Sequence, residues 1–483
     1  MFLGLDLGTS GLKAILTDAE GAIVATAAAT YDNPHPRVGW SEQDPADWVR
    51  ACEAVLDGLM ADAPQALAAL QGIGLSGHMH GATLVGANGD VLRPCILWND
   101  TRAAEEAAWM DEQPDIRAIT GNIVFPGFTA PKLLWLEKHE PAIFEKVAKV
   151  LLPKDYLRLW LTGEMIGDMS DCAGTSWLDV GARDWSDQAL AAGHMRRDQM
   201  PDLVEGSAPG GEVRATLRER WGINGPVTVA GSAGDNAAAA CGAGCFAEGQ
   251  GFVSLGTSGV LLAAKENYAP DAASDVHTFC HAVPDRWYQM GVILAATDCL
   301  NWLSRQVGKD PSTLIGLLPE KITGPSDLMF LPYLSGERTP HNDAKVRGAF
   351  VGLDVSHDVA DLTQAVVEGV SFALRDCMAA LSGTGTTLTS VLAMGGGARS
   401  TFWRETLATV LDVPLQVPAG GEFGAALGAA RLGITAATGA NPAEIMTPPD
   451  VGEVVEPNAA LSGVYADRWA TYRARYPLLS GDT

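Results

Sequence analysis

Short runs of apolar residues alternate along this chain with longer stretches in which apolar residues recur every three or four positions. A short apolar run that ends at a glycine or a polar turn is typical of a buried strand, whereas the longer spacing is typical of an amphipathic helix. The pattern predicts a strand over residues 22–28 and a helix that starts at Asp44 and Pro45, because Asp is a common N-cap and Pro is favoured in the first helical turn. It also predicts a long helix over residues 359–381 with one apolar face. Strands and helices that alternate in this way predict an α/β fold.

One five-residue segment, LGTSG, occurs twice, at residues 7–11 and at residues 255–259, about half the chain apart. Each copy lies between two apolar runs, so each predicts a β-hairpin, and the chain is expected to consist of two similar halves. Glycines allow a ligand to approach the backbone, and N–H groups and hydroxyls in such a turn can bind phosphate. Asp6 precedes only the first copy, which predicts that the first hairpin alone brings a carboxylate for a divalent cation. The candidate phosphate ligands are Gly8, Thr9, Ser10, Gly256 and Thr257.

The segment around Asp235 combines a predicted strand at residues 226–230, a glycine-containing turn at residues 231–234, and an alanine-rich helix that begins at Asp235 and Asn236. One interpretation makes Asp235 an ordinary N-cap. The other makes it a general base, because a helix N-terminus holds a carboxylate ionised and an ionised carboxylate can accept the proton of an alcohol that attacks a phosphoryl group. We favour the base, since a cap alone does not require the preceding glycines.

Two further glycine-containing segments contain candidate ligands. HMHG, which includes Met79 and His80, lies within a strand-like run over residues 72–85, and both a ligand site and a structural histidine are consistent with this position. Zinc is disfavoured because the two histidines lack a nearby third ligand. The three glycines at residues 395–397 join a predicted strand to a helix that begins near Ser400 and are a weak candidate for nucleotide binding. The GxGxxG pattern is not matched at such a turn, which argues against NAD.

The composition excludes several classes of partner. The 483 residues carry 33 Lys and Arg against 58 Asp and Glu, a net charge of −25, and a surface this acidic repels nucleic acids and anionic membranes. A few local donors can still bind one phosphorylated ligand. With 47% hydrophobic residues, no uninterrupted membrane-length apolar run, eight scattered cysteines and no signal peptide, the chain is expected to be a soluble, reduced, cytoplasmic protein of several packed domains.

The motifs together resemble the FGGY family of carbohydrate kinases along the full length of the chain. The two family signatures match GFTAPKLLWLEKH at residues 127–139 and GAFVGLDVSHDVADLTQAVVE at residues 348–368. The segments that most resemble the members acting on D-xylulose are WSEQDP, HMHGATL, RPCILWND, LLPKDYLRL, DMSDCAGTSWLDV, GDNAA and LPYLSGERTPH. One departure is His78, where family members have Gln, and it leaves the choice of sugar open.

The resemblance implies the architecture of the actin-like ATPases, with two RNase-H-like domains, residues 1–245 and residues 246–483, on either side of an interdomain cleft. It implies that Asp235 is the general base, that Met79, His80, Asp235 and Asn236 contact the sugar, and that Asp6 lies in the Mg²⁺ site. The nucleotide ligands that it implies are Gly8, Thr9, Ser10, Lys13, Gly256, Thr257, Gly396, Gly397 and Ala398.

The implied reaction is the ATP-dependent phosphorylation of D-xylulose to D-xylulose 5-phosphate with Mg²⁺, and a homodimer is compatible with the resemblance. The nearest alternative is a sibling kinase for another pentulose or polyol. A nucleotide-gated binding protein on the same fold, such as actin, is a different class that lacks a sugar-site base equivalent to Asp235.

Overall fold

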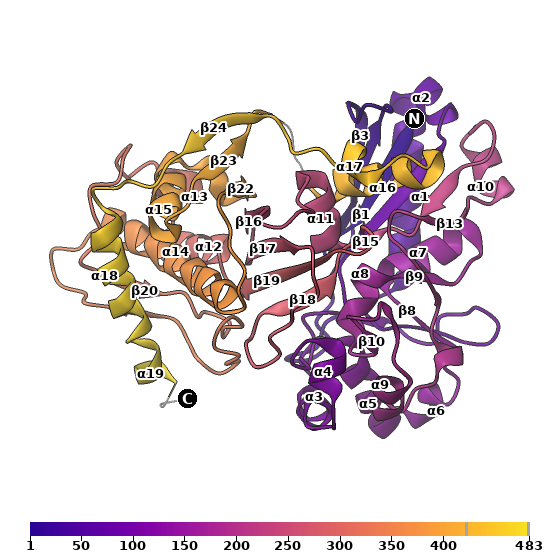
Figure 1. The fold of residues 1–483 in the computed structure, drawn as a ribbon, viewed down its shortest axis with the longest axis horizontal. Coiled ribbons are helices and arrows are strands. Elements are labelled where there is room, and N and C mark those ends of the chain that lie inside the picture. Colours follow the sequence, from indigo (N-terminus) through magenta and orange to yellow (C-terminus); the bar gives the residue numbers. More distant parts are fainter. Residues whose placement is uncertain (421–423, 481–483) are drawn as a thin grey trace.

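The computed structural model describes residues 1–420 and 424–480, which form two α/β domains, each built around a seven-stranded sheet (Figure 1). The first sheet has the strand order β13-β14-β5-β1-β2-β3, with β15 beside β5. β1 pairs antiparallel with β2 and parallel with β5, which places Asp6 near the carboxyl end of a central strand. The strands are β1 Phe2–Leu7, β2 Gly11–Thr17, β3 Ile23–Thr30, β5 Gly72–Gly77, β13 Pro209–Glu212, β14 Thr228–Ala230 and β15 Ala233–Gly234.

The second sheet repeats the central arrangement of the first. Its order is β18-β19-β17-β16-β22-β23-β24, and β16 pairs antiparallel with β17 and parallel with β22. Both LGTSG segments therefore connect the strands of an antiparallel hairpin, as the sequence repeat predicts. The strands are β16 Gly251–Leu255, β17 Gly259–Lys265, β18 His277–Cys280, β19 Trp287–Ile293, β22 Val391–Met394, β23 Leu415–Pro418 and β24 Val451–Val455.

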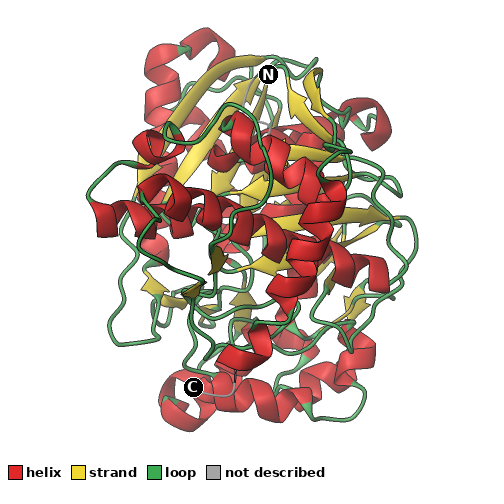
Figure 2. Cartoon of the chain, turned by 90° about the vertical axis from the view of Figure 1, so that its left-hand side faces the viewer, coloured by secondary structure: helices red, strands yellow, loops and turns green. Residues whose placement is uncertain are grey.

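Helices cover the sheets, and in Figure 2 those of the second domain lie in front of its strands. The helices of the first half are α1 Pro45–Asp62, α2 Pro64–Ala68, α3 Ala104–Asp111, α4 Ile116–Thr120, α5 Thr129–His139, α6 Pro141–Phe144, α7 Pro153–Thr162, α8 Met169–Cys172, α9 Asp187–Ala192, α10 Ala215–Arg220 and α11 Asp235–Ala243, with 3₁₀ turns η1 Ala173–Thr175 and η2 Arg197–Gln199. Those of the second half are α12 Thr297–Val307, α13 Pro311–Ile315, α14 Val359–Gly383, α15 Thr401–Leu411, α16 Ala425–Thr438, α17 Pro442–Ile445, α18 Ser462–Arg473 and α19 Tyr476–Leu479, with the 3₁₀ turn η3 Gly396–Arg399.

Short strand pairs outside the two main sheets stiffen the connecting segments. They pair β4 Glu42–Gln43 with β7 Cys95–Ile96, β6 Thr83–Val85 with β8 Lys149–Leu151, β9 Ile166–Asp168 with β12 Asp202–Val204, β10 Leu178–Asp179 with β11 Asp184–Trp185, and β20 Met329–Leu331 with β21 Ala349–Val351.

Helix α16 comes from the second half of the sequence but packs on the first domain. It lies against β5 and β1 on one side and against α11 on the other, and its yellow ribbon lies among indigo and purple elements in Figure 1. Glycines permit this close approach: Gly4 and Gly74 on the sheet leave no room for a Cβ against the backbone of α16. The two halves of the chain are therefore interlocked, and are not simply placed side by side.

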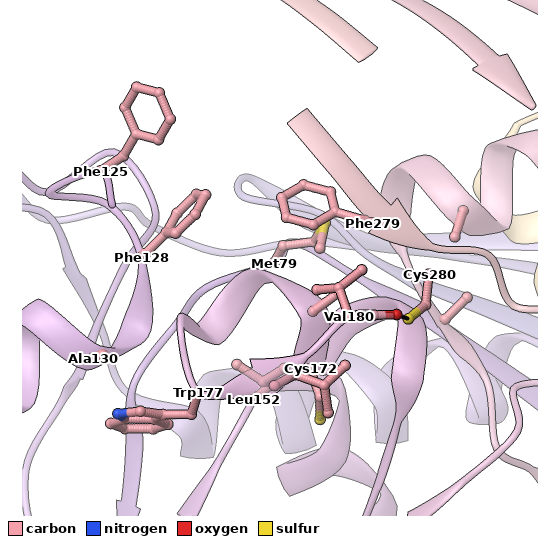
Figure 3. Close-up of a cluster of buried hydrophobic side chains, with 14 of the residues drawn as sticks. Met79, Phe125, Phe128, Ala130, Leu152, Cys172, Trp177, Val180, Phe279 and Cys280 are labelled. Atoms are coloured by element: carbon pink, nitrogen blue, oxygen red, sulfur yellow. Dashed lines mark hydrogen bonds between the residues drawn. The ribbon is translucent and has the colours of Figure 1, made fainter. Parts of the chain in front are cut away.

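A hydrophobic cluster joins the two domains near the predicted sugar-binding segment. It includes Met79, Phe125 and Phe128 from the first half and Phe279 from the second (Figure 3). Tyr288 of the second half belongs to the same cluster. Separate clusters fill the first domain around β1 and α1 and the second domain around α14.

Most local predictions from the sequence are confirmed. α1 begins at Pro45 with Asp44 as its N-cap, whose Oδ1 accepts from Ala46 N at 3.0 Å, and α14 spans Val359–Gly383 with Val366 and Val370 in the core. All eight cysteines are buried and unpaired. Within residues 1–420 and 424–480, every helix is too short or too polar to cross a lipid bilayer.

The prediction of one strand-like run over residues 72–85 is wrong. β5 ends at Gly77, residues 78–81 form a turn, and β6 begins at Thr83 and pairs with β8 outside the main sheet. The interruption arises because His80 adopts a left-handed backbone conformation, with φ of 70°. This conformation is rare for a non-glycine residue.

Candidate active site

The turn of the first hairpin is held in place by three side chains. Tyr31 donates from its hydroxyl to the Gly8 carbonyl at 2.5 Å, and Gln43 Nε2 donates to the Thr9 carbonyl at 2.6 Å. Trp98 Nε1 donates to Thr9 Oγ1 at 3.0 Å. Because both carbonyls face these donors, the turn is fixed before any ligand binds, and Ser10 remains exposed. Gln43 and Trp98 belong to the WSEQDP and RPCILWND segments. The sequence alone did not assign these two segments a role in holding the hairpin.

Three strands bring Asp6 and Asp235 to the same edge of the first sheet. Asp6 on β1 is opposite Ser76 on β5, and Ser76 is opposite Ala233 on β15, two residues before Asp235. Ser76 Oγ donates to Asp6 Oδ1 at 2.8 Å. Both carboxylates are half-buried, and they interact electrostatically.

Asp235 is the first residue of α11, and Gly234 occupies the N-cap position. The ordinary-cap interpretation of Asp235 is therefore wrong. Its Oδ1 accepts from Asn236 N at 2.7 Å and from Asn236 Nδ2 at 2.9 Å. Asn236 thus orients the carboxylate, and its amide group is committed to Asp235.

The expectation that the helix N-terminus holds Asp235 fully ionised also needs correction. Burial, followed by the neighbouring Asp6 carboxylate, raises the pKa of Asp235 to about 7, and the Asn236 hydrogen bonds only partly offset this rise. Desolvation outweighs the helix dipole here, because the dipole contributes about 1 kcal/mol or less. A carboxyl group with a pKa near neutrality can exchange a proton readily at physiological pH.

Met79 and His80 lie next to the Asp235 turn. The Met79 side chain fills the space in front of Gly234, where a Cβ would lie 2.8 Å from Met79 Cγ. His80 Nδ1 is 2.7 Å from the Gly174 carbonyl, and its ring stacks on Phe128 with centroids 4.4 Å apart. Burial lowers the pKa of His80 to about 3, so the imidazole is neutral.

The first FGGY-like signature explains the left-handed backbone of His80. Lys132 Nζ and Thr129 Oγ1, both on α5, donate to the His80 carbonyl at 2.7 and 3.1 Å. These two hydrogen bonds offset the cost of the positive φ, about 1–3 kcal/mol for a residue in a sparsely populated backbone region. The signature thus holds the proposed sugar contact in place.

The second domain contributes residues to this region that the sequence analysis missed. His277 and Phe279 on β18 stack on each other with centroids 5.4 Å apart, and the His277 ring meets Phe125 edge to face at 5.0 Å. The Arg338 guanidinium lies over Phe125, with Cζ 5.1 Å from the ring centroid. These residues belong to the HTF pattern of β18 and to the ERTPH segment. The sequence did not place them at this site, because their contacts are made across the domain boundary.

His78 does not face the sugar-binding region. Its imidazole is buried against Trp48 of α1, with centroids 5.8 Å apart and an edge-to-face geometry, and burial lowers its pKa to about 3. Trp48 Nε1 in turn donates to Gln43 Oε1 at 3.0 Å, and Gln43 holds the first hairpin. His78, the departure from the family pattern, therefore packs among the residues that support the first phosphate hairpin.

The second hairpin is docked on the N-terminus of α12. Thr297 donates from N and Oγ1 to the Gly256 carbonyl at 2.9 and 2.8 Å, and Ala296 N donates to the Thr257 carbonyl at 2.8 Å. Thr257 is exposed at the tip of the turn. In both hairpins, therefore, neighbouring residues donate hydrogen bonds to the carbonyl oxygens of the turn.

The predicted nucleotide-binding segment at residues 395–398 lies beside this second hairpin. β22 pairs with β16 so that Met394 is opposite Ser254, and the following Gly395 has a φ of 85°. A Cβ on Gly395 would lie 2.6 Å from the Leu255 carbonyl oxygen, so only glycine fits there. Gly396 is exposed with open space around it, whereas Gly397 and Ala398 are buried.

The chemistry of the Asp6 site fits a divalent cation. One Asp6 oxygen is engaged by Ser76, burial raises the pKa of Asp6, and the Asp235 carboxylate lies close enough to add to the negative potential. Two half-buried carboxylates favour a hard cation with oxygen ligands. The described part of the chain contains no cluster of three or more His, Cys, Asp or Glu side chains able to hold a metal by themselves, so phosphate and water oxygens would complete the coordination.

The chain is similar to known proteins along nearly its whole length. Residues 1–242 match the model of the N-terminal domain of the FGGY family of carbohydrate kinases, and residues 251–437 match that of its C-terminal domain. The chain is 45% identical to the xylulose kinase of Escherichia coli (strain K12) over 99% of both chains, and 47% identical to that of Klebsiella pneumoniae over 89% of both. A solved structure, described as a xyloylose kinase from Brucella ovis, is 56% identical with a TM-score of 0.96 over 99% of both chains.

Proposed function

The chain belongs to the FGGY family of carbohydrate kinases, and from that premise we propose that it transfers the γ-phosphoryl group of ATP to D-xylulose, producing D-xylulose 5-phosphate and ADP. The similarity to xylulose kinases along nearly the whole chain supports the sugar. The observation that carries the mechanism is the position of Asp235, with a pKa of about 7, between Asp6 and the Met79–His80 turn.

Asp235 acts as the general base. Its carboxylate accepts the proton of the sugar's terminal hydroxyl as the hydroxyl oxygen attacks the γ-phosphorus. Asn236 donates two hydrogen bonds to Oδ1 and so keeps the carboxylate group in a fixed direction. Met79 and the neutral His80 form the wall against which the sugar packs. Because Nδ1 donates its proton to the Gly174 carbonyl, Nε2 of the neutral imidazole is the atom left to accept a hydrogen bond from a sugar hydroxyl.

The first hairpin and Asp6 serve the phosphate end of the reaction. Exposed Ser10 and the backbone N–H groups of the turn provide donors to phosphate oxygens, and Lys13 on β2 is the cross-strand partner of Asp6. Asp6 would hold Mg²⁺, which neutralises the charge on the phosphate oxygens when it is bound. Gly256 and Thr257 in the second hairpin and Gly396, Gly397 and Ala398 beside it would bind the remainder of ATP.

The domain boundary, the cellular location and the oligomeric state are further proposals. The division of the chain near residue 245 is supported by the membership of the sheets, since strands before it join the first sheet and strands after it join the second. Helix α16, which packs on β5 and β1, departs from this division, and α17 lies beside it on the first domain. A cytoplasmic location and a homodimer also remain proposals.

Substrate choice is tested by coupled assays of ADP release over a panel of pentuloses, polyols and sugar acids. D-xylulose is expected to give the highest kcat/KM, because the chain is similar to xylulose kinases along nearly its whole length. A higher kcat/KM for glycerol, ribulose or gluconate would assign the chain to a sibling activity of the same family.

The pH dependence follows from the pKa of Asp235. The base works only when it is deprotonated, so kcat/KM for the sugar is expected to decrease by about tenfold per pH unit below a midpoint near pH 7. Asp6 contributes to the raised pKa, and Asp6→Asn is therefore expected to lower the pKa of the Asp235 carboxyl, measured by ¹³C NMR titration. A flat profile between about pH 5 and pH 8 would contradict a titrating base.

A further inference from the structure

Five ionisable side chains are buried beneath the turn that leads to Asp235. We call Lys154, Asp155, Arg158, Asp168 and Asp171 the Lys154 cluster; each of these side chains is fully buried, with 0% of its surface exposed. Lys154 Nζ lies 2.5 Å from Asp155 Oδ1, 2.6 Å from Asp168 Oδ2 and 3.3 Å from Asp171 Oδ2. Arg158 lies 3.7 Å from Asp155. The cluster lies within the LLPKDYLRL and DMSDCAGTSWLDV segments, to which the proposed reaction assigns no role.

The cluster contains two basic and three acidic side chains, so its net charge is zero only if one of the acids is protonated. Burial, with the nearby Asp168, Asp155 and Asp235 carboxyls, raises the pKa of Asp171 well above its usual value in spite of Lys154. A protonated Asp171 leaves two carboxylates against two cations. Burying such groups costs several kcal/mol per ion, and replacing a buried ion pair by apolar residues is often neutral or stabilising. Stability alone is therefore a weak explanation for the cluster.

The cluster is attached to both ends of the turn before Asp235. The Arg158 guanidinium donates to the Ala230 carbonyl and, at 2.5 Å, to the Gly231 carbonyl, where the turn begins. Ser170 Oγ donates to Asp168 Oδ1 at 2.5 Å and accepts from Gly234 N at 3.3 Å, where the turn ends. Gly234 is the residue directly before the proposed base.

The same cluster also touches the segment that carries Met79 and His80. Lys154 packs on the end of β5, where a Cβ on Gly77 would lie 2.9 Å from Lys154 Cβ. Asp168 is the N-cap of α8, and the 3₁₀ turn η1 follows α8 directly. The Gly174 carbonyl in η1 is the partner of His80 Nδ1. One rigid unit thus connects the sugar-binding turn with the turn of the base.

We propose that the Lys154 cluster fixes the position of the Asp235 carboxylate relative to Met79 and His80. Arg158 and Ser170 are the positioning residues, because they connect the cluster to the turn before Asp235. The inference rests on the proposed function only in taking Asp235 as the base. A buried ionic network suits this task because its partners are fixed in direction as well as in distance, and a displacement of about 1 Å at a reacting group can cost about 100-fold in rate.

The test uses Arg158→Lys and Ser170→Ala in the full chain. Arg158→Lys keeps the positive charge beside Asp155 but loses the planar pair of donors to Ala230 and Gly231. Both variants are expected to lower kcat with D-xylulose by about 10- to 100-fold, with the KM for ATP unchanged. Lys154→Met is a poorer test, since it leaves buried carboxylates without their cation and is expected to fail to fold.

Arg431→Lys is the matched control. Arg431 is buried and donates to the carbonyls of Cys241, Gly242 and Thr447 at 2.9 Å, so it holds the opposite end of the helix that begins with Asp235. This variant loses the same kind of hydrogen bonds without touching the turn, and its kcat is expected to stay within about twofold of the parent value. Equal losses of kcat in Arg158→Lys and Arg431→Lys would overturn the proposal, because they would indicate a general loosening of α11.

A double-mutant cycle separates this proposal from the choice of base. If Arg158 acts through Asp235, the Asp235→Asn/Arg158→Lys double variant loses no more activity than Asp235→Asn alone. Additive losses overturn the positioning role even if the kinase activity is as proposed. If no sugar is phosphorylated, a ¹³C NMR titration still decides: the pKa of Asp235 is expected to shift in Arg158→Lys and to stay unchanged in Arg431→Lys, and an unchanged pKa in both would overturn the proposal.

Discussion

Asp235→Asn is expected to lower kcat for sugar phosphorylation by about 10²- to 10⁴-fold while ATP still binds with its original affinity. Asn has nearly the same shape as Asp but cannot accept a proton, so the substitution removes the base and keeps the packing against Asn236. Steady-state ADP release gives kcat, and calorimetric titration with ATP gives the affinity. Near-normal turnover of Asp235→Asn would exclude the catalytic role of this carboxylate.

The same variant is expected to be at least as stable as the parent protein above pH 7. The pKa of Asp235 is raised in the folded state, so the folded state favours the protonated form; that contribution to stability is present at low pH and is lost as the pH rises from about 4 through about 7. At pH 8 the ionised carboxylate opposes folding, and Asn removes this opposition. A Tm of Asp235→Asn equal to or above the parent value at pH 8 is the expected outcome, and a marked decrease would indicate a structural role.

Asp187→Asn is the matched control for both measurements. Asp187 is also the first residue of a helix, α9, but it is exposed and paired with Arg197 on the surface. Its replacement is expected to leave kcat unchanged and to alter stability by less than about 0.5 kcal/mol, as for most surface substitutions.

Gly74→Ala is expected to destabilise the protein by more than about 3 kcal/mol, since overpacking costs about 1–3 kcal/mol where the structure can adjust, and more where it cannot. The new Cβ would overlap the Ala429 carbonyl oxygen and lie 2.6 Å from the Ala429 carbonyl carbon. These are backbone atoms of α16, which is confined between β5 and α11 and cannot move away. Urea unfolding monitored by fluorescence measures the free energy of unfolding.

Gly383→Ala provides the control for this substitution. Gly383 is the last residue of α14, and a Cβ there would meet no atom within 4 Å. Ala is favoured over Gly in a helix by about 1 kcal/mol, so this variant is expected to be neutral or slightly stabilised. If Gly74→Ala unfolded at the same urea concentration as the parent protein, the close packing of α16 on the first sheet would be wrong.

The sequence by itself predicted the features that depend on neighbouring residues. Both LGTSG hairpins, the start of α1 at Pro45, strand β14 and the start of α11 at Asp235 follow from turn chemistry, capping and the spacing of apolar residues, and these act over a few positions. The predicted turn at residues 231–234 is shorter in the structure, because residues 233–234 pair with β5 as β15. The repeat also indicated two similar domains, because equal local patterns form equal local structures.

Only the tertiary structure decided the features that depend on residues far apart in the chain. The packing of α16 on the first domain, the aromatic contacts of His277 and Phe279 with the sugar-binding region and the support of the Asp235 turn by Arg158 all join distant segments. The chemistry of Asp235 illustrates the reason. Its sequence neighbours suggested an ionised carboxylate, but its pKa depends on burial and on Asp6, which reaches it only after three strands align at one edge of the sheet. Local patterns determine local conformation, whereas desolvation and electrostatic potential are properties of the whole packed fold.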